Sequence, residues 1–230
     1  MCAICGNLRA MDDSESRPRA ALGVAVKSGW AAAVLLTGSP RSPRLADSRR
    51  IELSDPANPE SRQPYHAGFG AARASGPELS RLLRSVRRFG RHSVAALMRR
   101  YKTAGYQLAG VGVVVGSFID PERIANEHIR IHALEGRLFR RVVEEAAVGD
   151  ALPCSIWRDR DLYVAAAEAL NQPEQHVRAT AAALGAAVAG SWRAEQKTAA
   201  VAAWLMLAAS GPATRSIRGE GRRPDRARVI

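Results

Sequence analysis

Five short apolar segments along the chain predict β-strands. Residues 22–26, 30–36 and 45–53 are separated by short turns that contain glycine or proline, so they predict an antiparallel meander. Residues 111–115 are apolar without polar alternation, which is typical of a strand covered on both faces of a sheet. Residues 152–157 predict the fifth strand.

Segments with apolar side chains at three- and four-residue steps predict helices between and after these strands. The longest is 77–104, which has an apolar stripe and arginines over the rest of its surface. Residues 126–148 repeat the pattern, and shorter helices are predicted to end near residues 170, 188 and 208. Pro173 suits the first position of one of these helices, and Ser191 is the expected cap of the last.

The resulting order, β-β-β-α-β-α-β-α-α, predicts an α/β fold with a mixed five-stranded sheet and helices on both faces. We expect residues 1–20 to be a flexible arm, 21–208 to be one domain and 209–230 to be a basic flexible tail. Residues 54–76 are a long loop rich in proline and glycine, and a loop of this length is usually functional or mobile. Its Tyr65-His66 pair is predicted to fold over a site.

Composition excludes a mainly disordered chain, because 47% of the residues are hydrophobic and 24% are charged. The apolar run 199–209 is about half as long as a membrane-spanning helix, so we expect no membrane association. Of the three cysteines, Cys2 and Cys5 form a lone CxxC, which supplies too few ligands for a structural zinc ion. An odd number of cysteines without the spacing of a disulfide framework predicts a protein of the reducing cytoplasm.

The net charge of +12 is concentrated in two segments. Residues 81–102 carry eight basic side chains and no acid, and residues 211–230 of the C-terminal tail carry the remaining excess. Positive charge concentrated in this way predicts contact with the phosphates of DNA or RNA. The candidate nucleic-acid-binding residues are Lys27, Arg84, Arg87, Arg88, Arg91, Arg99 and Arg100. The alternative is a compositional bias, because only three of the 34 basic residues are lysine and arginine is abundant throughout.

The order of elements resembles the ribonuclease H-like fold, nearest to its Holliday-junction-resolvase branch. The resemblance covers roughly residues 21–208. It is carried by the segment GVAVKSG at 23–29, by the apolar strand 111–115 and by the segment EQKTAAVA at 195–202. It implies a nucleic-acid partner and two-metal phosphodiester hydrolysis with Mg²⁺ or Mn²⁺ held by carboxylates.

The chain departs from that family at its acidic positions. Ala25 stands where the first strand of the family has aspartate, and Val115 or Gly116 stands where the fourth strand has glutamate. In the last helix Thr198 replaces one aspartate, and Glu195 alone keeps a carboxylate. The leading hypothesis is therefore a catalytically degenerate relative, a pseudoenzyme that binds nucleic acid through its basic helix and tail.

A relocated catalytic centre is the second hypothesis. His128 and His132 are four residues apart and Glu135 follows three residues later, so all three fall on one helical face. Together with Asp120 and Glu195 they are the candidate catalytic residues of a diverged metal-dependent nuclease or phosphodiesterase. The sequence does not indicate which of them would bind the metal. The alternative readings are that the histidines lie beside the buried stripe of their helix and that Asp120, before Pro121, forms a turn.

A third hypothesis is a protein-interaction scaffold. Alanine-rich helical segments at 177–188 and 198–208 allow close helix packing and are candidate surfaces for a homodimer. The sequence does not decide between an enzyme and a binding protein.

Overall fold

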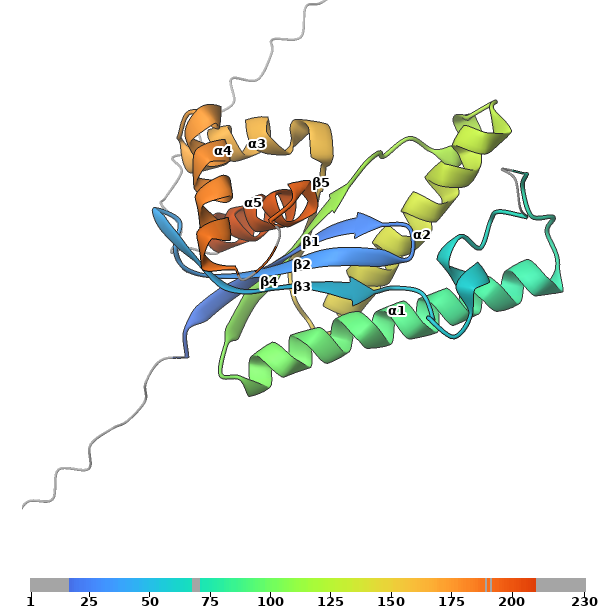
Figure 1. Cartoon of the computed structure of the whole chain (residues 1–230), viewed down its shortest axis with the longest axis horizontal. Helices are drawn as coiled ribbons and strands as arrows, with labels where there is room; N and C mark the ends of the chain where they lie inside the picture. Colours follow the sequence, from blue (N-terminus) through green and yellow to red (C-terminus); the bar gives the residue numbers. More distant parts are fainter. Residues whose placement is uncertain (1–16, 68–70, 189, 191, 210–230) are drawn as a thin grey trace, which may run out of the picture.

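A computed structural model describes residues 17–67, 71–188, 190 and 192–209. Its centre is a five-stranded sheet in the order β3-β2-β1-β4-β5 (Figure 1). The strands β1 (Arg19–Lys27), β2 (Trp30–Ser39) and β3 (Ser42–Glu52) pair antiparallel. The strands β4 (Gln107–Val115) and β5 (Cys154–Arg158) continue the sheet in parallel with β1. The predicted α/β fold with a mixed five-stranded sheet is confirmed.

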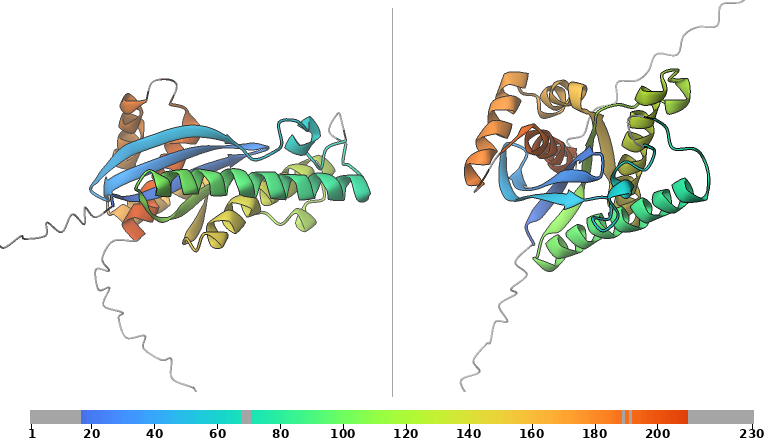
Figure 2. Two further views of the ribbon diagram at one scale, coloured as in Figure 1. Left: turned by 90° about the horizontal axis from the view of Figure 1, so that it is seen from below. Right: turned by 45° about the vertical axis from the view of Figure 1, so that its right-hand side comes forward.

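Two long helices, α1 (Pro77–Thr103) and α2 (Glu127–Gly149), cover one face of the sheet (Figures 1 and 2). The face is apolar because alternate residues of β1 point toward these helices, and Leu22 and Val24 are fully buried among them. The stripe predicted on α1 forms the contact, with Val86 and Val94 fully buried. The arginines of α1 are thereby left on the outer side.

The opposite face of the sheet is covered by α5 (Ala194–Ala209), with α3 (Leu162–Leu170) and α4 (Glu174–Ala183) packed around it (Figure 2). The sequence of α5 is apolar on all sides, which is typical of a helix enclosed by protein, and its residues are buried from Thr198 to Leu207. The proposal that 198–208 forms a homodimer surface is therefore wrong, because this segment is covered by the chain itself.

Two glycines let α5 lie close to the sheet. Gly23 of β1 and Gly112 of β4 are partners in the parallel ladder. A Cβ atom on Gly23 would lie 1.8 Å from the carbonyl oxygen of Ala199, and one on Gly112 would lie 2.6 Å from that of Ala202. Both clashes are with helix backbone, so no side-chain rotation relieves them.

The element boundaries differ from the predicted ones where pairing or packing extends a segment. β3 begins at Ser42 instead of residue 45, because Pro43 lies on an edge strand, where its missing N–H costs no ladder bond. The helix predicted to continue to 188 ends at Ala183 and is followed by a short 3-10 helix, η4 (Leu184–Ala187). The predicted cap Ser191 lies outside the described residues.

Several predictions concern segments that the structure does not describe. Residues 1–16 of the expected arm 1–20, with Cys2 and Cys5, and residues 210–230 of the expected tail 209–230 lie outside the described residues, whereas residues 19 and 20 already belong to β1. Within the described part of the chain, no helix combines the length and apolar character that crossing a membrane requires.

Candidate functional site

The carboxyl ends of β1 and β4 open onto a cavity of about 600 Å³. This is the end of a mixed α/β sheet at which ligands usually bind. The cavity is lined by the β1–β2 turn, by the loop after β4 with the 3-10 helix η2 (Pro121–Arg123), and by the first turns of α2. Its polar and charged lining side chains are Lys27, Ser28, Ser117, Asp120, His132, Arg137, Arg140 and Arg141.

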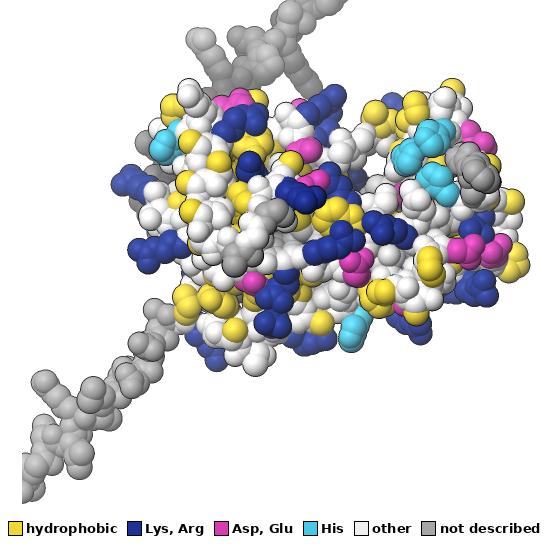
Figure 3. All heavy atoms as spheres, viewed as in Figure 1, with side chains coloured by type: hydrophobic (Ala, Val, Ile, Leu, Met, Phe, Trp, Pro, Cys, Tyr) yellow, Lys and Arg dark blue, Asp and Glu magenta, His cyan; other side chains and the backbone are white. Residues whose placement is uncertain are grey.

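The start of α2 places two histidines side by side. Asn126 caps the helix, and its Oδ1 accepts a hydrogen bond of 3.0 Å from the backbone N–H of Ile129. This fixes the helical phase, so His128 and His132 share one face as the sequence predicted. Their Nε2 atoms lie 3.2 Å apart. Both residues are exposed, and a group of histidine side chains is visible at this edge of the molecule (Figure 3).

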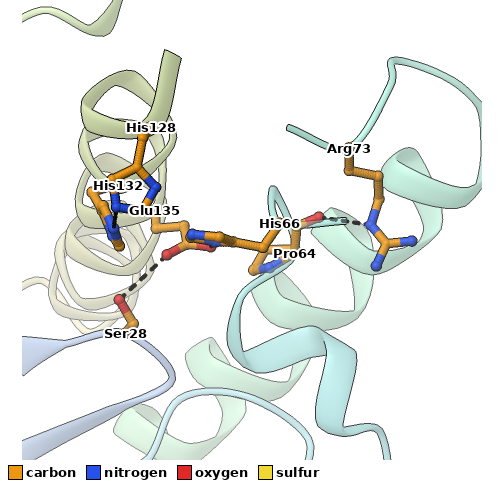
Figure 4. A network of polar contacts seen from close by, with 7 residues as sticks. All are labelled: Ser28, Pro64, His66, Arg73, His128, His132 and Glu135. Atoms are coloured by element: carbon orange, nitrogen blue, oxygen red, sulfur yellow. Dashed lines mark hydrogen bonds and ion pairs between the residues drawn. The ribbon is translucent and has the colours of Figure 1, made fainter. Parts of the chain in front are cut away.

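A third histidine reaches the same place from the long loop. His66 forms an isolated β-bridge with Ala72, and Arg73 holds the loop by donating from Nε to the carbonyl of Pro64 at 3.1 Å (Figure 4). The ring of His66 lies 5.0 Å from that of His132 and 6.1 Å from that of His128, centroid to centroid. The ligand nitrogens of these three residues, the histidine cluster, all lie within 4.8 Å of one another.

Glu135 lies behind the histidine cluster. It is fully buried, its Oε1 lies 2.8 Å from Nδ1 of His66, and its Oε2 accepts from Oγ of Ser28 at 3.5 Å (Figure 4). Burial raises the pKa of Glu135, while the hydrogen bond and the charge of His66 oppose this shift. Burial and the neighbouring His128 and His66 lower the pKa of His132, so its imidazole is more readily neutral.

The other candidate catalytic residues have different partners. Asp120 caps η2 through a bond from the N–H of Glu122, and it forms an ion pair of 3.5 Å with Arg137. Asp120 lines the cavity together with His132. Its capping role agrees with the alternative prediction that Asp120 and Pro121 form a turn. Glu195 of α5 forms an ion pair of 3.6 Å with Lys27. The structure thus brings together His128, His132 and Glu135, and it places Asp120 and Glu195 in separate ion pairs.

The positions that the sequence analysis matched to the acids of the resolvases hold few metal ligands. Ala25 is 3% exposed and belongs to the apolar cluster beneath α5, next to its ladder partner Val114. Thr198 is buried at the same interface and donates to the carbonyl of Glu195. Glu195 alone supplies a carboxylate among these positions, and Lys27 pairs with it. This donor set does not fit a pair of Mg²⁺ ions, which need several oxygen ligands.

The outer side of α1 forms a second candidate site, which we call the basic face. All seven arginines of α1 are exposed: Arg81, Arg84, Arg87, Arg88, Arg91, Arg99 and Arg100. Arg91 forms an ion pair of 3.7 Å with Glu145. The other six form no ion pair with any residue in the described part of the chain.

Spacing along α1 gathers part of the basic face around a hollow. Arg81, Arg84 and Arg88 are three and four residues apart, so they lie on one side of the helix. Together with Asn58, Glu60 and Ser85 they line a cavity of about 580 Å³ between α1 and the 3-10 helix η1 (Pro59–Arg62). Lys27 is not part of this surface, because it lies at the end of β1 and lines the other cavity.

Similarity to known proteins lies in the fold. No protein-family model matches the chain, and no curated protein matches its sequence. Thermus thermophilus RuvC, solved in complex with a Holliday junction substrate, is superimposable with a TM-score of 0.50 and 13% identity, over 84% of this chain and 96% of that one. The fold is ribonuclease H-like. A second structure of T. thermophilus RuvC matches at 12% identity and a TM-score of 0.48, over 81% of this chain and 92% of that one.

The resemblance to the resolvase branch is thereby confirmed at the level of fold. The order of elements along the chain predicted this fold. At 13% identity, the likeness does not assign the catalytic residues or the substrate of RuvC to this chain.

The sequence predicted that His66 folds over a site but not which residues it meets there, and it predicted no role for Arg73. No periodicity links a loop residue to a helix 62 positions later, so the sequence holds no signal for the contact of His66 with α2. The burial of Glu135 did leave a signal. It lies four residues after Ile131 and three before Leu138, both of which are buried, so a carboxylate stands within the apolar stripe of its helix.

Proposed function

We propose that the protein binds nucleic acid through the basic face of α1 and does not cleave it at the place used by the resolvases. The observation that carries this proposal is the set of six exposed arginines on one helix without ion-pair partners in the described structure. Guanidinium groups match the geometry of phosphate oxygens. An uncompensated row of them favours a polyanion over a neutral ligand.

Two further observations support the proposal. The fold is that of RuvC, a protein that has been seen in complex with a Holliday junction substrate. The apolar packing of Ala25 beneath α5 leaves no metal ligand at the position matched to the first-strand aspartate of the family. Binding without cleavage at that centre is consistent with both.

Salt dependence tests this proposal. We expect the full chain to bind junction, duplex and hybrid probes with little sequence preference, and to bind them more weakly at higher salt, with a logarithmic slope of about −0.9 for each duplex phosphate contacted. Fluorescence anisotropy at several salt concentrations measures both affinity and slope. Affinity that stays unchanged at high salt contradicts the proposal. A chain without polyanion affinity would direct attention to the scaffold hypothesis and a protein partner.

A second candidate function is metal-dependent phosphodiester hydrolysis at a relocated centre. The observation that favours it is the approach of His66, His128 and His132 beside a cavity that contains arginines. We expect any such cleavage to require a divalent ion, with Mg²⁺, Mn²⁺ and Zn²⁺ compared, and to be lost in His128→Ala. Gel analysis of labelled junction, hybrid and single-stranded probes measures it. Uncleaved probes with all three ions exclude this function.

A further inference from the structure

Two imidazoles on α2 already have the spacing of metal ligands. A tetrahedral ion with metal–nitrogen bonds of about 2.0–2.1 Å holds neighbouring nitrogens about 3.3 Å apart. The Nε2 atoms of His128 and His132 lie 3.2 Å apart. The pair therefore already has the nitrogen separation that a shared ion requires, and the spacing of four residues keeps both rings on one side of the helix.

The third imidazole needs only a small movement. His66 completes a set in which one ring nitrogen of each residue lies within 4.8 Å of the others, a limit about 1.5 Å longer than the nitrogen spacing around one tetrahedral ion. His66 is on a loop, and its ring already points toward α2 (Figure 4). Three of the five histidines in the chain gather here.

The contact of His66 with Glu135 has the form of an outer-shell interaction at a metal site. The carboxylate lies 2.8 Å from Nδ1 of His66 and favours the tautomer that carries its proton on this atom. In the neutral form of that tautomer Nε2 has no proton and is available as a ligand. The carboxylate is itself fully buried and is held on its other oxygen by Ser28. Carboxylate–histidine pairs of this kind orient ligand rings and increase their basicity.

We infer that His66, His128 and His132 bind one transition-metal ion of the Zn²⁺ class and that Glu135 is the positioning residue of this site. Three neutral imidazoles suit Zn²⁺, Co²⁺, Ni²⁺ or Cu²⁺ and not Mg²⁺, which prefers oxygen ligands. The site differs in ligands and in position from the carboxylate centre of the resolvases. Its existence does not depend on nucleic-acid binding by the basic face.

Three protein ligands leave a coordination position open for a further ligand. His132 also lines the cavity of about 600 Å³, whose cationic side chains include Arg137, Arg140 and Arg141. Arg141 is exposed and forms no ion pair within the described residues. The open position therefore lies beside a cationic cavity, and the ligand that fits it is an anion of the phosphate class.

Titration of the metal-stripped full chain with Co²⁺ tests the site, because the visible spectrum of Co²⁺ reports coordination by protein ligands and Zn²⁺ then competes for the same place. We expect one equivalent to bind and Zn²⁺ to displace it. His128→Ala and His132→Ala each lower the affinity at least about 100-fold. Both residues are exposed, so these variants keep their fold, which circular dichroism verifies.

The matched controls are His92→Ala and His176→Ala, which remove exposed histidines on α1 and α4 and leave binding unchanged. Glu135→Gln keeps a hydrogen-bonding group without the charge, and we expect about tenfold weaker binding. Equal affinity in His132→Ala and the wild type overturns the site, as does a wild-type chain that binds neither ion. Binding through Cys2 and Cys5 would give that equality.

Inorganic phosphate added to the Co²⁺-loaded chain tests the open position. We expect it to change the visible spectrum, with weaker phosphate binding in Arg141→Ala. A spectrum that phosphate leaves unchanged overturns the anion assignment, while the metal titration stands by itself. Since neither readout uses nucleic acid, failure of this inference and failure of the proposed function are distinguished.

Discussion

Reversing two charges on the basic face, Arg84→Glu with Arg88→Glu, is expected to lower the affinity for duplex DNA at least about tenfold and to reduce the salt slope by about 2. Both side chains are exposed, lie one helical turn apart and line the same hollow. The variant removes two phosphate contacts and adds repulsion in their place. Anisotropy titrations at several salt concentrations measure the change.

The matched control changes the net charge equally on a distant surface. Arg41→Glu with Arg160→Glu alters exposed residues in the β2–β3 turn and before α3, so it also lowers the formal charge by four. We expect this control to keep the wild-type salt slope and most of the affinity. If the two double variants bind equally, the basic face is not the binding surface and net charge alone explains the affinity.

Gly23→Ala is expected to destabilise the protein by about 3 kcal/mol. The added methyl group would meet the carbonyl oxygen of Ala199 at 1.8 Å and the backbone nitrogen of Ala203 at 2.9 Å. The main chain of α5 must move away from the sheet to accommodate it, which loosens the most enclosed helix of the fold. Urea denaturation followed by circular dichroism measures the loss of unfolding free energy.

Gly136→Ala is the control for this substitution. Gly136 lies on α2, and a Cβ atom there would meet no heavy atom within 4 Å apart from its chain neighbours and the backbone of its own helix. Because alanine is the better helix former, we expect a gain of about 0.5–1 kcal/mol. Opposite signs for the two variants attribute the effect of Gly23→Ala to its contact with α5. A Gly23→Ala protein as stable as the wild type would mean that α5 does not pack as closely as described.

Local pattern predicted most of the fold, because the apolar positions of each strand and helix match the faces that the element buries. The run 111–115 became a central strand, and the stripe of 77–104 became the buried side of α1. The sequence did not determine the split of α4 from η4 at Ala183, where tertiary packing overrides a continuous helical pattern.

The candidate site was predictable only where it lies within one element. The spacing of His128 and His132 settles their approach, since four residues on a helix return to the same side. The position of His66 depends on how a loop of irregular backbone folds back, which is decided by contacts such as that of Arg73 with Pro64. Asp120 was assigned to chemistry, but its neighbour Pro121 begins a short helix and the carboxylate caps it.

The order of the strands has a consequence for the chain while it is being made. The ribosome releases β1, β2 and β3 early, and they form a meander by themselves. One side of that meander, with Ala21, Ala32 and Leu36, is buried chiefly by α5, the last element in the described part of the chain. A nascent polypeptide therefore carries an uncovered apolar surface through most of its translation. Synthesis halted before Ala194 would leave that surface exposed to aggregation.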